Sequence, residues 1–262
     1  MLTQYDYKIS NKNSDTALIN AAIVITDQAE YVNSRIQIDA AEDFGFVPVN
    51  MPHLITLLKN TYLAPIIRSY PTDIVSGNYH GSINGNRINV TAHGDHPLAS
   101  VERLSEAWNN RIDNGFMPIY NDETKKLFKE AVPISDVRKG YDASNQAIAI
   151  NLGKDKPVIA RDGHITYNDW MIDDYVLSVC GNLENRESLG QYLFKIEKKK
   201  RDVIRNTHNV YNMPYDKTIG QLLLLGGFNS GINFPCGSKD YRGRFIGSNN
   251  PQYVRDHHIK LG

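Results

Sequence analysis

The sequence predicts a mixed α+β fold: a small mixed sheet with flanking helices, followed by a helical C-terminal part with a long irregular tail. Short apolar segments bounded by Gly, Pro and Asn recur in the first two-thirds of the chain, as expected of strands. Apolar residues with helical spacing lie between them and prevail after Tyr167. Residues 228–262 are rich in turn-forming Gly, Asn, Ser and Pro. We therefore predict a mixed α/β domain at residues 1–166 and a helical part with an irregular tail at residues 167–262.

Strands are expected where short apolar runs stand between turn signals. Six segments meet this description: residues 44–49 (FGFVPV), 72–76 (TDIVS), 87–92 (RINVTA), 116–120 (FMPIY), 146–151 (QAIAIN) and 157–160 (PVIA). Residues 21–26 (AAIVIT) fit either a buried strand or the core face of a helix. Residues 77–86 (GNYHGSINGN) join the second and third segments, and their Gly and Asn content predicts a loop.

Helices are expected where capping residues precede apolar residues with a helical period. Asn50 as cap and Pro52 in the first turn predict a helix with Leu54 and Leu57 on one face, which ends or bends at Pro65. Further helices are expected from Pro97 through Asn110, from Asn168 through Val179, from about residue 184 to residue 205, and from Asp216 through Leu225. The basic run at residues 198–201 is expected on a solvated helix face.

Composition narrows the function classes. The chain of 262 residues contains 29 basic and 29 acidic residues, so it lacks the overall charge typical of proteins that bind nucleic acids or anionic membranes. The longest apolar run, at residues 222–225, is too short to span a bilayer. The N-terminal residues show no signal-peptide pattern, so synthesis in the cytoplasm is expected. Cys180 and Cys236 have no metal-binding spacing and are expected to be reduced thiols.

The strongest candidate for chemistry is the segment at residues 89–102 (NVTAHGDHPLASVE), which places two histidines and an aspartate close together. Imidazole and carboxylate groups are zinc ligands, and alternate residues of a strand share a face, so His93 and Asp95 could converge. His96 is the alternative to Asp95, but it would need the turn to bring it to the same side. The distant third candidate is His164, beside another predicted strand. We predict these three residues as candidate metal ligands and assign no catalytic residue. The alternative is that they are polar loop residues, with Asp95 capping the helix that Pro97 opens.

Five fragments, in chain order, resemble the zinc peptidoglycan peptidases of the D-Ala-D-Ala carboxypeptidase type, which are common among phage endolysins. They are residues 14–17 (SDTA), 63–68 (LAPIIR), 74–77 (IVSG) with Tyr79 and Asn84, 91–93 (TAH) and 164–167 (HITY). In that family the fragments similar to TAH and HITY carry the first and last zinc ligands, so the resemblance implies that His93 and His164 bind zinc. It also implies a peptidase-like fold over about residues 1–170.

The sequence departs from the family's pattern at important positions. Ser100 stands where the family has an aspartate ligand, and His96 and Leu98 replace its glycine and alanine. The arginine of the family's SGYR loop is missing, and no glutamate precedes His164 as a general base. The implied zinc set is incomplete, so either Asp95 supplies the missing ligand or the fold is kept and the chemistry is lost.

A second histidine pattern offers another enzymatic alternative. His80-Gly81-Ser82 and His164-Ile165-Thr166 are similar to the paired motifs of two-histidine phosphoesterases, in which one histidine acts as base and the other as acid. Eight histidines in the chain produce two such matches easily by chance, and Gly81 breaks the usual apolar position.

Two hypotheses of different class follow. The first is a non-catalytic structural or adaptor component of a phage- or virus-like particle. It would work through contacts with other protein subunits as an oligomer in the virion, without a cofactor, membrane or nucleic acid partner. The alternative is a divergent zinc-dependent peptidoglycan hydrolase, in which the metal would activate a water for amide hydrolysis. Ser100 separates the two, because the hydrolase needs a carboxylate at that position, and the sequence therefore favours the first.

Overall fold

The computed structural model describes most of the central part of the chain. The described residues are 2–6, 22–26, 47–58, 72–99, 106, 110, 117–118, 121–154, 163–196, 203–205, 218–226, 232–237, 244–245 and 247–248. The expected strand at residues 157–160 and the basic run at 198–201 lie outside them. Of the helix expected from Pro97 through Asn110, a short 3-10 turn at Pro97–Ala99 is described.

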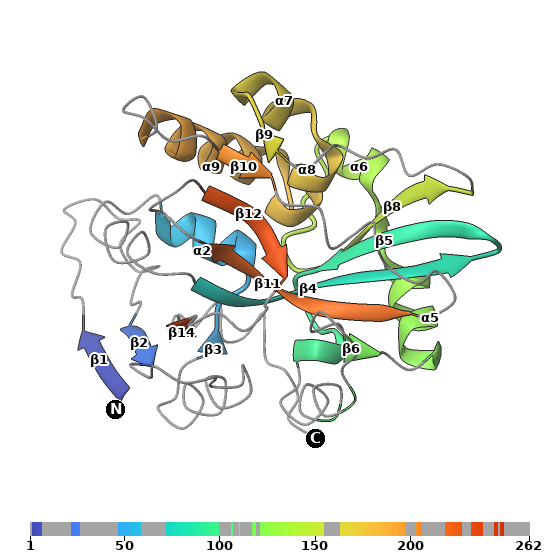
Figure 1. The fold of residues 1–262 in the computed structure, drawn as a ribbon, viewed down its shortest axis with the longest axis horizontal. Helices are drawn as coiled ribbons and strands as arrows, with labels where there is room; N and C mark the ends of the chain where they lie inside the picture. The colour runs from blue at the N-terminus through green and yellow to red at the C-terminus, as the bar shows by residue number, and fades with distance from the viewer. Residues whose placement is uncertain are drawn as a thin grey trace.

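A ten-stranded mixed sheet forms the centre of the fold, with the main strand order β7-β8-β5-β4-β11-β12-β10-β9 (Figure 1). These strands are β4 (Thr72–Ile83), β5 (Asn86–Ala92), β7 (Val132–Pro133), β8 (Ala147–Gly153), β9 (Gly163–His164), β10 (Val203–Arg205), β11 (Ile219–Gly226) and β12 (Ile232–Gly237). Short strands β6 (Met117–Pro118) and β13 (Arg244–Phe245) pair with β11 and β4. Two further two-stranded pairs are β1 (Leu2–Asp6) with β2 (Ala22–Thr26) and β3 (Val47–Pro48) with β14 (Gly247–Ser248).

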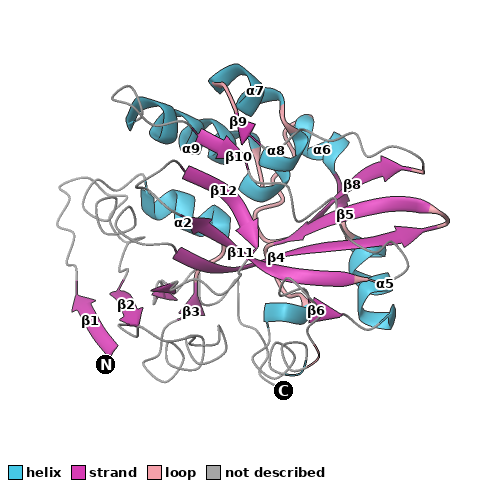
Figure 2. Ribbon diagram, in the orientation of Figure 1, coloured by secondary structure: helices cyan, strands magenta, loops and turns pink. Residues whose placement is uncertain are grey.

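Helices lie on both sides of this sheet, as the cyan ribbons of Figure 2 show. They are α2 (Met51–Leu58), α5 (Asn121–Glu130), α6 (Ile134–Arg138), α7 (Tyr167–Ile172), α8 (Asp174–Cys180) and α9 (Leu183–Ile196). Figure 1 places α6 to α9 on one side of the β4–β5 hairpin and α5 on the other. The predicted class, a mixed α+β fold with helices flanking a mixed sheet, is confirmed.

The β4–β5 hairpin is longer than the sequence indicated. Most of the expected loop at residues 77–86 belongs to β4, which pairs with β5 from Gly77 opposite Ala92 to Ile83 opposite Asn86. The turn itself is Asn84-Gly85, with positive φ at both residues (51° and 76°). An Asn-Gly turn with this geometry matches the twist of the two strands that it joins. The loop prediction was wrong because the glycines within β4 allow close packing rather than a bend.

The two faces of the hairpin differ in chemistry, since alternate residues point to opposite sides. One face packs with α5 into an apolar cluster, the α5-side cluster: Val75, Tyr79, Val90, Ala92, Leu98, Leu127, Phe128 and Leu222. The other face lies under α8 and carries buried polar side chains. A larger apolar cluster continues on that side from Ile150 to residues of α2, α8 and α9. The hairpin is therefore buried on both faces.

Several local predictions can be compared directly with the structure. Asn50 caps α2 as expected, with its Oδ1 accepting from the His53 amide at 2.9 Å. The helix expected from Asn168 through Val179 is two helices, α7 and α8, separated at Asp173. The cap of α7 is Thr166 rather than Asn168, and the side chains of Thr166 and Asp169 form a capping box. The helix predicted from Asp216 through Leu225 was wrong, because Ile219–Gly226 forms strand β11. The helix expected to reach residue 205 was wrong at its end, because Val203–Arg205 forms strand β10.

The position of β11 links distant parts of the chain. It pairs with β4 on one side and β12 on the other, so strands from both sides of the predicted boundary near residue 166 share one sheet. Strands far apart in the sequence also meet in the pairing of β14 with β3. None of the helices in the described ranges combines the length and apolarity that a membrane crossing requires.

Candidate functional site

Three residues of the segment at 89–102 belong to a group of buried polar side chains, here called the polar layer. It occupies the face of the central strands that lies under α8, as the strand registers show. Its members on the sheet are Ser76, Asn78, His80, Asn89, Thr91, His93 and Gln221, each with an exposed fraction of 7% or less. Polar groups this deeply buried need hydrogen-bond partners. The partners decide what the layer can do.

His93 is held by two hydrogen bonds, one at each ring nitrogen. Nε2 lies 2.8 Å from the carbonyl oxygen of Ser178, which can only accept, so Nε2 carries the proton. Nδ1 forms the second hydrogen bond, with the Ser76 hydroxyl at 2.9 Å. The side chain of Asn50 donates to the backbone carbonyl of His93 at 2.8 Å and so fixes the end of β5. His93 thus joins the sheet to α8.

The Ser178 side chain extends this connection. Its hydroxyl donates to the carbonyl of Tyr175 at 2.8 Å, and Thr91 lies 3.0 Å from its Oγ. Since the Ser178 proton is already directed to Tyr175, Thr91 is the donor of the second bond. Two hydrogen bonds between β5 and α8 therefore join at one serine.

His96 lies at the α5-side cluster rather than in the polar layer. Its Nε2 donates to the carbonyl of Val75 at 2.6 Å, and the Tyr79 hydroxyl donates to its Nδ1 at 2.6 Å. The same hydroxyl accepts from the Leu98 amide at 3.1 Å. Burial lowers the pKa of His96 to about 4, against smaller opposing effects of Val75 and Asp95. The imidazole is neutral near pH 7 and stabilises the turn after β5.

His80 and Asn78 form the outer part of the polar layer. The Asn78 amide donates to His80 Nε2 and to the Tyr175 hydroxyl, each at 3.1 Å. Burial lowers the pKa of His80 to about 3, so this histidine is also neutral. Asn78 Oδ1 and both amide atoms of Asn89 have no hydrogen-bond partner, although they are fully buried. Among the described side chains of the polar layer, these three buried atoms are the ones without a hydrogen-bond partner.

The structure does not bring the three predicted metal ligands together. Asp95 is exposed, whereas His93 is buried. The backbone of His164 lies in β9, which four strands separate from β5, a distance of about 24 Å across a flat sheet at ~4.8 Å per strand. Within the described residues, no group of three His, Cys, Asp or Glu side chains could hold a metal ion. The side chain of His164 lies outside the described residues, so its role as a ligand stays a prediction.

Sequence reasoning missed the residues that determine the roles of the histidines. Ser76, Asn78 and Tyr79 stand in what was expected to be the end of a strand and a loop, and Ser178 lies in a helix with no motif. The alternation of polar with apolar residues in β4 was the available signal. It resembles a half-exposed strand, and sequence alone does not show that α8 covers the polar side.

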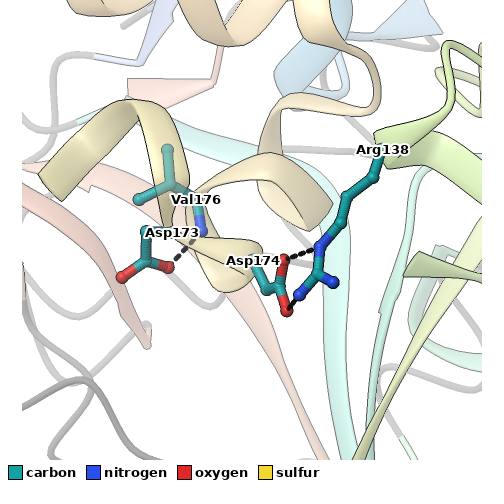
Figure 3. Close-up of polar contacts among 4 residues, drawn as sticks. All are labelled: Arg138, Asp173, Asp174 and Val176. Atoms are coloured by element: carbon teal, nitrogen blue, oxygen red, sulfur yellow. Dashed lines mark hydrogen bonds and ion pairs between the residues drawn. The ribbon is translucent and has the colours of Figure 1, made fainter. Parts of the chain in front are cut away.

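A second polar arrangement lies on the surface, where α6 meets α8 (Figure 3). Arg138 makes a two-pronged contact with the Asp174 carboxylate, including Nε to Oδ1 at 2.6 Å. The neighbouring Asp173 caps α8 by accepting from the Val176 amide at 3.0 Å. Along the chain, two exposed apolar side chains lie close to this ion pair: Ile172, 78% exposed, and Tyr141, 47% exposed.

Cys180, the cysteine whose side chain the structure describes, offers no reactive thiol. Cys180 is free and buried at the end of α8. Burial raises the pKa of its thiol, which keeps it protonated and unreactive. The side chain of Cys236 lies outside the described residues.

Comparison with known proteins identifies the fold. No family model matches the sequence, and no curated protein matches it. A solved structure, described as the accommodation of massive sequence variation in Nanoarchaeota by the C-type lectin fold, is similar, with a TM-score of 0.59. The similarity covers 81% of this chain and 92% of that one, at 20% sequence identity.

This similarity overturns the expected resemblance to zinc peptidases. The peptidase-like fold is wrong, because the arrangement of strands and helices over most of the chain is that of a different fold. The fragments that suggested it are three to six residues long, and the TAH fragment carries a structural histidine. The protein has a C-type lectin fold.

Proposed function

We propose that this protein is a non-catalytic structural or adaptor component of a phage- or virus-like particle that acts through protein–protein contacts. The observation that carries the proposal is the bonding of His93 and His96. Both ring nitrogens of each histidine are engaged in hydrogen bonds within the core. Side chains used in this way support a binding scaffold, since a catalytic histidine needs a nitrogen directed at substrate or metal.

The fold supports the same proposal. The similar Nanoarchaeota structure is described as accommodating massive sequence variation. A scaffold of that kind combines an internal framework with a surface that tolerates change, which suits recognition of other proteins. In this chain the polar layer and the α5-side cluster would be the framework.

The surface at the junction of α6, α7 and α8 is the contact site that we favour. Ile172 and Tyr141 are exposed and lie close in sequence to Asp174 and Arg138, and aromatic and Arg side chains are enriched in the energetically important parts of interfaces. The partner would be another subunit of the particle, beginning with a second copy of this chain.

The first test measures assembly directly. Sedimentation velocity over a wide range of protein concentration should show reversible self-association, and Ile172→Ser should weaken it by about tenfold or more. Lys125→Ser on α5, whose side chain is 76% exposed, is the matched control and should leave association unchanged.

The second test measures location. Quantitative mass spectrometry of purified particles from the producing culture should find the chain in a fixed ratio to the other particle proteins. A chain that stays monomeric at all concentrations and is missing from the particles would contradict the proposal.

A further inference from the structure

The polar layer contains an unsatisfied region between two neighbouring strands. Asn78 and Asn89 have exposed fractions of 0% and 1%. Their unpartnered atoms are Asn78 Oδ1, Asn89 Oδ1 and Asn89 Nδ2. A buried polar group without a partner costs about 1–3 kcal/mol, so three such atoms in one place require an explanation.

The strand register places these atoms on one face and close to each other. Asn78 lies opposite Thr91, and Asn89 lies opposite His80, so the two asparagines are diagonal neighbours on β4 and β5. Diagonal neighbours have Cα atoms roughly 7–8 Å apart, and their Cβ atoms are closer. The two side-chain amides make no hydrogen bond to each other, yet a small molecule hydrogen-bonded to both could bridge them.

The chemistry of the surrounding groups selects the kind of molecule. Two of the unpartnered atoms are acceptors and one is a donor, so the molecule must both donate and accept. The neighbouring polar groups are uncharged: an imidazole whose pKa burial lowers to about 3 at His80, the Tyr175 hydroxyl and the Thr91 hydroxyl. An ion would lose its hydration here without a counter-charge, which is strongly unfavourable.

The size of the site is limited by apolar neighbours. Ile150 lies opposite Asn89 on β8, and Ile219 lies opposite His80 on β11, and both are buried. The solvent is nevertheless near, because Ser82, two residues beyond His80 on the same face of β4, is exposed. A water-sized molecule could therefore enter and leave through a short opening of the hairpin tip.

From this geometry we infer that Asn78 and Asn89 form a buried binding site for water, in which at least one molecule bridges the two side-chain amides. Water supplies two donors and two acceptors, and internal waters typically make about three hydrogen bonds to buried polar groups of this kind. The bridging water completes the polar layer and fixes β4 against β5 near the turn. This inference does not depend on the proposed function.

The test compares water retention in the wild-type protein with that in Asn89→Leu. Magnetic relaxation dispersion of ¹⁷O water counts internal molecules with long residence times. The count should fall by at least one in Asn89→Leu and stay unchanged in Asn168→Leu, the same substitution at an exposed position on α7. Equal counts in the wild type and in Asn89→Leu would overturn the inference.

A crystal structure of the wild type at atomic resolution provides a test that needs no variant to fold. A single-atom density peak within about 2.7–3.2 Å of Asn78 Oδ1 and of one Asn89 amide atom is the expected result. Direct bonds from both amides to protein groups, or the density of a larger molecule between them, would overturn the inference.

Discussion

The two faces of the β4–β5 hairpin are buried by opposite means. Towards α5, apolar side chains such as Val90 and Phe128 pack around Tyr79. Towards α8, polar side chains of the hairpin form hydrogen bonds, as at His93 and Asn78. The first face gains stability from burial of apolar surface. The second is satisfied only in one arrangement of donors and acceptors, so it specifies how α8 sits on the sheet.

The difference teaches that buried histidines can be structural on either face. His96 belongs to the side of Tyr79 and His80 to the polar layer, and both are neutral because burial disfavours their charged forms. The following predictions test how far the two faces differ, beginning with the largest effect.

Acid should destabilise both faces at once. The pKa of histidine is about 6.5 in the unfolded chain, and burial lowers it in the folded protein to about 3 for His80 and about 4 for His96. Below about pH 6.5 the unfolded state therefore binds more protons, and the free energy of unfolding falls as the pH falls towards 4. The loss at about pH 4 should approach 3 kcal/mol for each histidine.

Urea unfolding at a series of pH values between about 7 and 4 measures this loss. His80→Gln should reduce the pH dependence by about half, since one of the two groups is removed. An unchanged free energy of unfolding over this range would show that the histidines are not held neutral by burial.

On the apolar face, Tyr79→Ala should cost about 3–5 kcal/mol, because it removes a fully buried ring from a packed cluster. The ring lies against the backbone of the neighbouring strand, where a Cβ at Gly220 would come within 2.8 Å of it. Tyr79→Phe, which keeps the ring but leaves His96 Nδ1 and the Leu98 amide without this partner, should cost about 1–3 kcal/mol. Equal losses in chemical denaturation would mean that the hydroxyl, rather than the ring, stabilises this face.

On the polar face, His93→Leu should cost about 1–3 kcal/mol, because the Ser178 carbonyl and the Ser76 hydroxyl lose their partner. Since both ring nitrogens bind protein groups, a metal chelator should leave the melting temperature of the wild type unchanged. A chelator that lowers the melting temperature of the wild type but not of His93→Leu would restore a metal-binding role to this histidine.

The smallest effect is expected outside both faces, at the exposed ion pair. Arg138→Ala should change the free energy of unfolding by less than about 1 kcal/mol, as is usual for exposed pairs. Asp173→Ala, which removes the cap of α8 next to this pair, should cost about 1 kcal/mol. If Arg138→Ala proved the more harmful, the α6–α8 contact would depend on the ion pair rather than on the apolar cluster that Val137 and Leu177 share.

Local signals in the sequence predicted α2 correctly and β11 incorrectly. The Asn50 cap and the spacing of Leu54 and Leu57 located α2, whose apolar residues are buried as expected. The apolar run in β11 was misassigned because a strand buried on both faces lacks the alternation of a half-exposed strand. A short apolar run of that kind can be read as a buried helix, and only its pairing with β4 and β12 decides the matter.

The candidate site was harder to predict than the fold class. His93 and Asp95 were grouped because they are two residues apart, yet one side chain is buried and the other exposed. The partners of His93 lie 17 and 85 residues away in the sequence, on β4 and α8. Contacts at such separations leave no local pattern, so a histidine that supports a core and one that binds a metal look alike in sequence.

The place of β11 between β4 and β12 has a consequence for synthesis. While the chain emerges from the ribosome, β4 is synthesised well before its neighbour β11, which begins at Ile219. Until then one long edge of the β4–β5 hairpin is open to pairing with other chains. Folding of the centre therefore comes late in translation, and a nascent chain stalled before residue 219 should aggregate or recruit chaperones.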